Sequence, residues 1–485
     1  MSVAVGSLLA RLLLLSLLFL GMAGCESLPK PTLRAQPLEM PALKETLQES
    51  HPMKWGDWPR SEWWRDFHSP ALNELIALAL THNPSLQVIA HRVREAKALA
   101  EIRVAELLPS VEASLSLTGQ HFSANSIQSK FAGESFALAL FNPLNVRYYL
   151  DFWGRNRAAL EAALGIAQAK EAELAQARLL LATALARTYF RMVAAAEGQR
   201  LSQAMLDLQR QHLDIDQLRV ARGLDPKAPL HGAEQKLEQA KQQQAIRRAE
   251  TEILRAELAA LTSHGPDWGR QIPVKATQFP REFPLPKDLP LKLLAHRPDV
   301  AAARYLAEAA AQEIKVAKTA FYPNVNLMGF AGLHSANLPD LLFSGQSLAF
   351  LAGPVLDLPI FEGGRLRANL KAKQAAYDAA VEAYNNTLLR AVQGVAEALA
   401  HWKAVHDLLI AQRDSLEAMR KNERLAEVGY KMGLNDQRAV LGARYALYQE
   451  RFQLITLEAG YLQAAVGLIE ALGGGYHNSA VPAPR

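Results

Sequence analysis

Residues 154–158 read Gly-Arg-Asn-Arg-Ala, and residues 364–368 read Gly-Arg-Leu-Arg-Ala, 210 positions later. The same offset relates Gly223-Leu224-Asp225 to Gly433-Leu434-Asn435 and Gly265 to Gly475. Upstream, at an offset of 214, His82-Asn83-Pro84 returns as His296-Arg297-Pro298 and Leu108-Pro109-Ser110-Val111 as Tyr322-Pro323-Asn324-Val325. Five landmarks in the same order at only two offsets indicate a tandem duplication whose second copy is four residues shorter in one segment.

Each copy begins with a helical pattern that changes into strands. Apolar residues recur at helical spacing over 71–107 and again over 299–320, and both runs end before a proline. Apolar and polar residues then alternate over 111–118 and 146–152, and more loosely over 324–333 and 347–358. This period of two predicts two strands in each copy.

A long helix follows the strands in each copy. Residues 154–222 and 365–432 are rich in Ala, Leu, Gln, Glu and Arg without proline, which predicts helices of about 65 residues, roughly 100 Å long. Gly223 and Gly433 are expected to end them in the left-handed conformation. Asp225 is expected to be the N-cap residue of a returning helix that has Pro226 at its first position, with Asn435 offering the same restart. The returning helices are predicted to end near Thr262 and Leu472.

The four predicted strands are too few to cross a membrane alone. A membrane barrel must be closed to leave no unpaired edge, and bacterial barrels start at about 8 strands. If these strands enter a membrane, the chain must therefore pool them with copies of itself.

The N-terminus predicts export and lipidation. One arginine, the apolar run 12–20 and small residues up to Gly24 are typical of a secretory signal peptide covering 1–24. Met22-Ala23-Gly24-Cys25 resembles the bacterial lipobox, which implies diacylglyceryl and N-acyl groups on Cys25 as the only cofactor-like addition. An ordinary cleavage site beside a coincidental cysteine is the alternative. The same resemblance to bacterial lipoproteins implies sorting to the outer membrane, because Glu26 rather than Asp follows the cysteine.

These patterns divide the chain into six segments. The signal peptide, 1–24, is followed by a lipidated, proline-punctuated tether, 25–62, and the first repeat, 63–265. A proline-rich linker, 266–290, joins it to the second repeat, 291–475, and a tail, 476–485, ends the chain.

Composition and motifs argue against several function classes. A single cysteine among 485 residues excludes a disulfide framework and a thiolate metal site, and a formal charge of +5, or +4 without residues 1–24, argues against a nucleic-acid partner. Glu362-Gly363-Gly364-Arg365 lacks the spacing of a phosphate-binding loop, and the 13 histidines form no HExxH motif. We therefore predict no catalysis and no metal site.

The ordered motifs resemble the TolC-like outer-membrane factors of tripartite efflux systems, in the NodT/MdtP-like lipoprotein branch. The resemblance covers nearly all of the mature chain and is carried by Trp63-Trp64-Arg65-Asp66-Phe67, Leu150-Asp151-Phe152-Trp153-Gly154-Arg155-Asn156-Arg157, His296-Arg297-Pro298-Asp299-Val300, Phe321-Tyr322-Pro323, Leu358-Pro359-Ile360-Phe361-Glu362-Gly363-Gly364-Arg365-Leu366 and Ala471-Leu472-Gly473-Gly474-Gly475-Tyr476. It implies a mostly α fold with a small transmembrane β part, in which a homotrimer builds a helical tunnel and a 12-stranded barrel. It also implies a passive exit duct in the outer membrane for drugs or other small toxic compounds, with a periplasmic adaptor and an inner-membrane RND or MFS transporter as partners.

The resemblance assigns roles to the two tight turns. Gly223, Leu224, Gly433 and Leu434 would be periplasmic tips that meet the adaptor, although they are also compatible with ordinary helix-hairpin turns. Tyr430, three residues before Gly433, matches a gate tyrosine of the family. The acidic gate positions fall on Ala439, Gly442 and Pro229, so the gate candidates are Tyr430, Asp436 and Arg438, with Arg444 nearby.

Two other functions fit parts of the chain. A lipid-anchored coiled-coil adaptor would also be exported and rich in helical hairpins, but adaptors carry one hairpin whereas this chain has two copies. A structural lipoprotein would explain the helices but not the four alternating strands.

Overall fold

The structure is a computed structural model that describes residues 33–39, 55–56, 58–125, 130, 132–273, 285–286, 296–336 and 345–477. The chain divides into two compact units, neither of which is one sequence repeat. The first comprises 1–37, 93–170 and 303–384, and the second comprises 38–92, 171–302 and 385–485. Each compact unit thus contains segments of both repeats, so the units do not coincide with the predicted segments.

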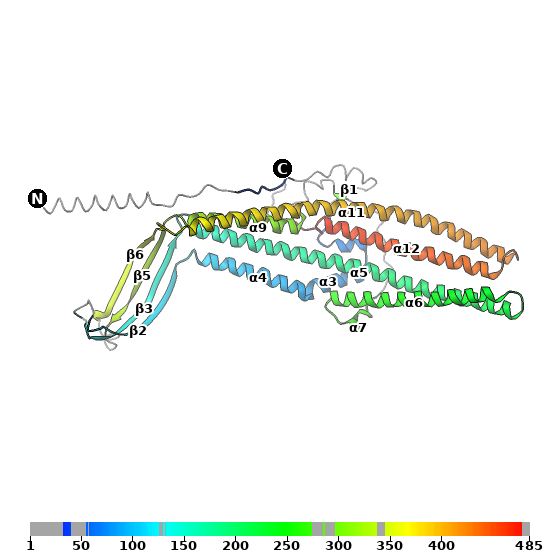
Figure 1. Cartoon of the computed structure of the whole chain (residues 1–485), viewed down its shortest axis with the longest axis horizontal. Coiled ribbons are helices and arrows are strands. Elements are labelled where there is room, and N and C mark those ends of the chain that lie inside the picture. The colour runs from blue at the N-terminus through cyan, green and yellow to red at the C-terminus, as the bar shows by residue number, and fades with distance from the viewer. Residues whose placement is uncertain are drawn as a thin grey trace. The chain divides into compact units, whose positions relative to one another are not determined.

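The first repeat follows the predicted order of elements (Figure 1). Its elements are η1 (Trp63–Phe67), α3 (Pro70–His82), α4 (Pro84–Ala105), β2 (Ser110–His121), β3 (Ser135–Leu150), α5 (Arg155–Ala221) and α6 (Lys227–Leu261). The predicted linker begins with a short helix, α7 (Pro266–Gly269), and β4 (Leu285–Pro286) pairs in parallel with β1 (Trp55–Gly56).

The second repeat has the same order without a counterpart of α3 in its described residues. Its elements are α9 (Pro298–Thr319), β5 (Asn324–Ser335), η3 (Gly345–Ser347), β6 (Leu348–Asp357), α11 (Arg365–Lys431) and α12 (Gln437–Ala471). The two long helices, α5 and α11, have 67 residues each, and the returning helices, α6 and α12, have 35 each. The internal repeat therefore extends to equal helix lengths.

One predicted helical region is broken in two. The pattern over 71–107 is interrupted at Asn83, whose backbone is extended and whose side chain accepts a hydrogen bond from the Leu86 N–H at 3.2 Å. Pro84 then starts α4, because a proline removes a helical hydrogen bond and biases the preceding residue away from the α region. The Asn83 amide also donates to the Leu261 carbonyl at 3.1 Å, which fixes the break against the end of α6.

The first unit contains a four-stranded antiparallel sheet of order β2-β3-β5-β6. Figure 1 shows the four strands side by side. One β-hairpin supplies the neighbours β2 and β3, and the other supplies β5 and β6. The two repeats meet at the β3–β5 pair, where Val146 lies opposite Gly329 and Leu150 opposite Val325. Among the described residues, β2 and β6 each have one edge without a partner.

The second unit holds the largest apolar core. Aromatic residues of η1 and α5, among them Trp63, Phe67, Tyr189 and Phe190, are buried together with Tyr461 and neighbouring residues of α12. In the described part of the chain α5 and α12 each contain a window apolar enough to cross a membrane, but 56% and 44% of these windows are buried within the protein. The core thus explains much of their apolar character.

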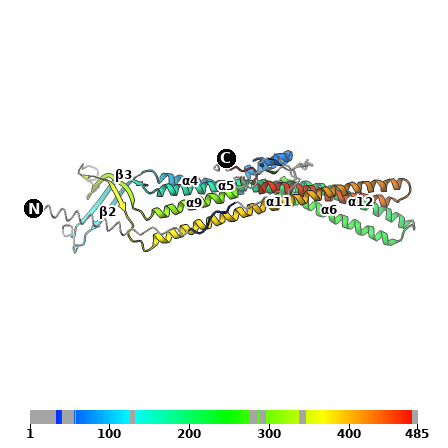
Figure 2. The same ribbon diagram turned by 90° about the horizontal axis from the view of Figure 1, so that it is seen from above.

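The long helices pair as two hairpins. Helix α5 lies beside α6, and α11 beside α12, in both views (Figures 1 and 2). In the second hairpin, Gln412 and Ser415 of α11 donate to the Glu450 carboxylate of α12 at 2.6 and 3.0 Å.

Candidate functional site: the sheet and the helical tips

One face of the four-stranded sheet is apolar and exposed. Cross-strand partners lie on the same face of a sheet, so Val111, Val146 and Gly329 form one row and Leu150, Val325 and Leu356 another. The exposed side chains on this face include Val111 on the edge strand β2, which is 61% exposed, and Phe350 on the edge strand β6, which is 78% exposed. An apolar surface of this extent marks contact with a protein or a membrane.

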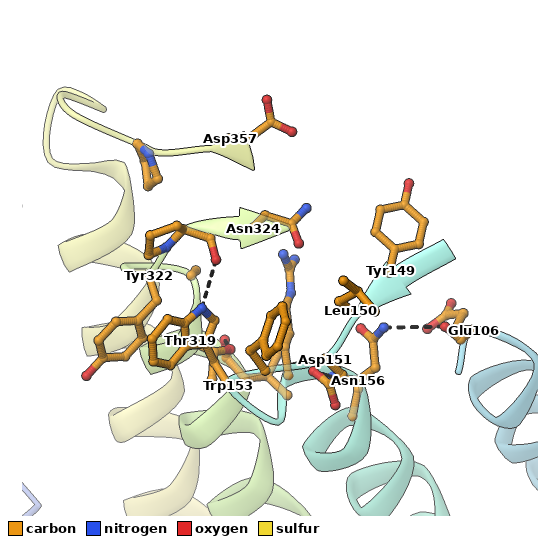
Figure 3. A pocket seen from close by; sticks show the side chains of 18 of the residues that line it. Glu106, Tyr149, Leu150, Asp151, Trp153, Asn156, Thr319, Tyr322, Asn324 and Asp357 are labelled. Carbon is orange, nitrogen blue, oxygen red and sulfur yellow. Dashed lines mark hydrogen bonds between the residues drawn. The ribbon is translucent and has the colours of Figure 1, made fainter. Parts of the chain in front are cut away.

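The opposite face of the sheet is polar near its base. Arg147 pairs with Ser110 there, and Asn324 pairs with Asp357. These residues line a concavity of about 1410 Å³ that lies within the first unit, between the strand ends and the adjoining helices. Figure 3 shows Tyr149, Asn324 and Asp357 at its strand side. A sheet with one apolar and one polar face fits a boundary between lipid and water.

The strand-to-helix junction of the first repeat and the helix-to-strand junction of the second are joined at this concavity. The Trp153 indole donates to the Pro323 carbonyl at 2.8 Å and stacks on Tyr322, with ring centroids 4.9 Å apart (Figure 3). Asp151 accepts the backbone N–H groups of Asn156 and Arg157, both at 3.0 Å, and so holds the first turn of α5.

The two helical tips, in the second unit, share one backbone design. The Gly223 N–H donates to the Val220 carbonyl at 3.0 Å, and the Leu224 N–H donates to the Arg219 carbonyl at 2.9 Å. The same pair of bonds, 3.0 and 2.8 Å, recurs around Gly433 and Leu434. The glycine φ angles, 71° and 74°, lie in the left-handed region, so both turns are Schellman motifs as the sequence predicts.

Side chains from both tips form a tip network of five charged residues. Arg438, at the start of α12, donates to Asp216 of α5 at 3.2 Å, to Asp225 of the first tip at 2.9 Å and to Asp436 at 2.7 Å. Arg219 binds Asp225 through two further hydrogen bonds of 2.7 and 3.0 Å. The side chain of Asp216 is only 5% exposed. The network therefore joins the first hairpin to the second within one chain.

The charges of the network stabilise one another. Hydrogen bonding by Arg219 holds the pKa of Asp225 below its usual value. Burial opposes ionisation of Asp436, yet hydrogen bonds from Arg438 and the Ala439 N–H outweigh it, so the pKa of Asp436 is also lowered. The guanidinium pKa of Arg438 is raised, chiefly by its hydrogen bond to Asp436. All three groups are therefore charged at neutral pH.

The network corrects the predicted cap of the first returning helix. Asp225 is not its N-cap residue: α6 begins at Lys227, with Pro226 as N-cap and no side-chain capping bond. The Asp225 carboxylate instead binds two guanidinium groups, because charge-assisted hydrogen bonds are stronger than a neutral cap. In the second tip the N-cap residue is Asp436 rather than Asn435, and it accepts from the Ala439 N–H at 3.2 Å.

The structure places the other predicted site residues apart from this network. Tyr430 is 45% exposed, and Leu224 and Leu434 at the tips are 61% and 75% exposed. Arg444 binds Glu423 and Glu427 of α11 at 3.0 and 3.1 Å, so it braces the second hairpin and does not join Arg438. Cys25 and the signal peptide lie outside the described residues.

Sequence reasoning missed two members of the network. Arg219 and Asp216 lie inside a long helix rich in similar residues, and their spacing from each other has no distinctive pattern. Their partners come from the other side of a turn and from the other repeat, so no local signal marks them.

The sheet with one apolar face and the paired helical hairpins together fit a class of membrane proteins that combine strands with long helices. The chain belongs to the outer membrane efflux protein family, whose model matches residues 75–264 and 289–474. It is 33% identical to the multidrug resistance outer membrane protein MdtP of Escherichia coli O6:H1, covering 96% of this chain and 97% of that protein. It is 31% identical to the multidrug resistance outer membrane protein MdtQ of Escherichia coli O157:H7, covering 95% and 97%.

Solved structures have the same fold. The outer membrane protein VceC of Vibrio cholerae superposes with a TM-score of 0.78 at 30% identity, over 86% of this chain and 100% of VceC. The outer membrane channel CmeC of Campylobacter jejuni gives a TM-score of 0.82 at 24% identity, over 93% of this chain and 96% of CmeC. The fold is TolC-like, and the protein is an efflux channel of the outer membrane. The predicted fold class, membrane location and exit-channel function are thus confirmed.

Proposed function

We propose that the chain acts as a homotrimer in which three four-stranded sheets close into one 12-stranded barrel. The observation that carries this proposal is the sheet itself, with its exposed apolar face and its unpaired edges on β2 and β6 among the described residues. Pairing β6 of one subunit with β2 of the next satisfies both edges and turns the apolar face toward lipid. The polar face then lines a water-filled lumen.

The channel conducts passively. The long helices continue the lumen as a tunnel across the periplasm, while an inner-membrane transporter of the RND or MFS class supplies the energy and a periplasmic adaptor docks at the exposed tips around Leu224 and Leu434. The names of the relatives MdtP and MdtQ support drugs or other small toxic compounds as cargo. No catalytic step belongs to this role.

The tip network acts as the resting lock of the tunnel entrance. It joins α12 to α5 through Arg438, so the two hairpins cannot separate without breaking at least its bonds to Asp216 and Asp225. Separation would leave the buried Asp216 carboxylate without its guanidinium, which is costly. Adaptor docking at the neighbouring tips is in position to release it.

Acyl groups on Cys25 anchor each subunit in addition to its strands, since two or more acyl chains make a membrane anchor durable.

Native mass spectrometry of protein extracted from outer membranes in detergent tests the trimeric assembly and the lipid anchor together. We expect a trimer of chains that begin at an acylated Cys25. A monomer in every detergent would contradict the barrel, and a trimer of unmodified chains would contradict only the lipid.

A further inference from the structure

A second, smaller cavity lies between the two hairpins, close to the tip network. Its volume is about 300 Å³, and its walls come from α5, α6 and α12. The residues lining it are Leu208, Gln209, His212, Lys236, Gln239, Leu441, Gly442 and Tyr445. His212 and Gly442 are each four residues, one helical turn, from the network residues Asp216 and Arg438.

The hairpins are tightly packed on the far side of this cavity. Phe452 of α12 fits against Gly198 of α5, where a β-carbon would lie 2.8 Å from Cε2 of the phenylalanine. The Arg247 guanidinium of α6 covers the same ring at 4.5 Å from its centroid. The interface thus consists of a packed aromatic contact, then the cavity, then the ionic tip network.

The cavity exists partly because α12 has no side chain at Gly442. A β-carbon at this position would meet no atom within 4 Å. Glycine in a helix interior is destabilising relative to alanine. A longer side chain at position 442 would therefore stabilise α12 and would also fill the cavity.

The lining residues offer distinct chemistry at two points. Gln209 is 8% exposed, and its Oε1 accepts no hydrogen bond within the described residues. Lys236 is exposed, and its acidic neighbours on α6 are engaged with other groups, Glu234 with His231 and Glu238 with Lys241. Leu208 and Leu441, both buried, supply apolar wall between them.

We propose that this cavity binds a compact amphipathic carboxylate that also carries a hydrogen-bond donor. The carboxylate pairs with the Lys236 ammonium, the donor satisfies the Gln209 carbonyl oxygen, and the apolar body lies against Leu208 and Leu441. The volume, near the lower limit for ligand pockets, selects a molecule smaller than a typical drug.

Binding would favour the locked arrangement of the tips. The ligand contacts α12 together with α5 and α6, so it has its full set of contacts only while the two hairpins are together, and a ligand shifts an equilibrium toward the state that it binds better. This effect on conduction rests on the proposed function, whereas binding itself does not.

Fluorine NMR titration of the full-length protein in detergent with 5-fluoroindole-3-acetate tests the site. This probe has an aromatic body, a carboxylate and an indole N–H donor. We expect saturable binding that weakens at least about tenfold in Gly442→Met, which fills the cavity, and in Lys236→Met. The carboxamide and the N-methyl analogues should also bind more weakly, because each lacks one of the two polar contacts.

A matched control is available on α6. Gly232→Met introduces the same side chain at a helical glycine that also has open space around it but does not line the cavity, so binding should be unchanged. Gln209→Leu gives a second test if Gly442→Met folds poorly, as judged by circular dichroism. Equal affinity in the wild type, Gly442→Met and Gln209→Leu, or no binding of the probe to the wild type, would overturn the site.

Single-channel recording separates this proposal from the proposed function. The probe should lower resting conductance in the wild type and leave it unchanged in Gly442→Met. Absence of conductance in every variant would contradict the channel, while the NMR result would still decide the site. Binding without an effect on a conducting channel would overturn the coupling to the tips.

Discussion

The first and second tips have the same backbone and different side chains. Gly223-Leu224 and Gly433-Leu434 make the same pair of Schellman hydrogen bonds, yet Asp225 in the first tip corresponds to Asn435 in the second. Arg438 has Ala228 at its equivalent position in the first repeat. Duplication has therefore kept the turn and changed the charges, so that the first hairpin supplies Asp216 and Asp225 and the second supplies the Arg438 guanidinium that binds both.

Removing that guanidinium should produce the largest change. Arg438→Ala breaks every hydrogen bond from the second hairpin to Asp216 and Asp225, and loss of such charged hydrogen bonds costs about 2 kcal/mol. We expect resting conductance in planar bilayers to rise by more than about tenfold. Arg444→Ala is the matched control, since within the described residues the side chain of Arg444 binds Glu423 and Glu427 of its own hairpin. Equal effects of the two substitutions would remove the tip network from the gate.

Exchanging the side chains of the tips tests whether their difference matters. Asp225→Asn keeps the shape of the residue but loses the charge that binds Arg219 and Arg438, so resting conductance should rise roughly threefold to tenfold. Adding Asn435→Asp to this variant restores the net charge. We expect no recovery of the low resting conductance. A carboxylate at position 435 lies in the same tip as Arg438, so it does not link the two hairpins. Full recovery would mean that net charge at the entrance, rather than the specific pairing, controls the gate.

Acid should open the channel only at low pH. Asp225 and Asp436 have pKa values below the ordinary value near 3.9, so their contribution is fully present above about pH 4 and is lost as the pH falls through the lowered values. Resting conductance should be flat from pH 8 to pH 5 and should rise below about pH 4. The facing charged groups are Arg219, Arg438 and Asp216. A rise between pH 7 and pH 5 would indicate another titrating group.

The shared backbone of the tips predicts equal effects on folding. Gly223→Ala and Gly433→Ala each place a β-carbon at a φ near 70°, at a cost of about 1–2 kcal/mol. The two variants should therefore lower the midpoint of thermal unfolding by similar amounts. A marked difference would show that side-chain contacts, and not the turn, dominate the stability of one tip.

Tyr430→Ala should have the smallest effect on conductance. The resemblance to TolC-like proteins points to this tyrosine as a gate residue, but its side chain is 45% exposed and lies outside the tip network. We expect a change of less than about twofold, consistent with a surface substitution. A change as large as that of Arg438→Ala would indicate that Tyr430 acts between subunits.

Much of the fold is predictable because its signals are local. The long helices, the two strands of each repeat and the glycine turns follow from periodicity, proline positions and the need for a left-handed residue. The break at Asn83 does not follow from the apolar pattern, which continues on both sides of it, although Pro84 marks the position. The N-cap prediction for Asp225 is wrong because its carboxylate binds Arg219, on the other side of the turn, and Arg438, in the other repeat.

The sequence by itself determined the duplication, the order of elements and the family. Repeated landmarks and helix or strand periods are local signals that can be recognised without knowing which residues contact one another in space. Only the tertiary structure decided which charges meet at the tips, where the cavity beside Gly442 lies and which sheet face is apolar across all four strands. These features join residues from different repeats, and chain folding sets their distances. Pairwise partners of this kind leave no period or motif in one sequence.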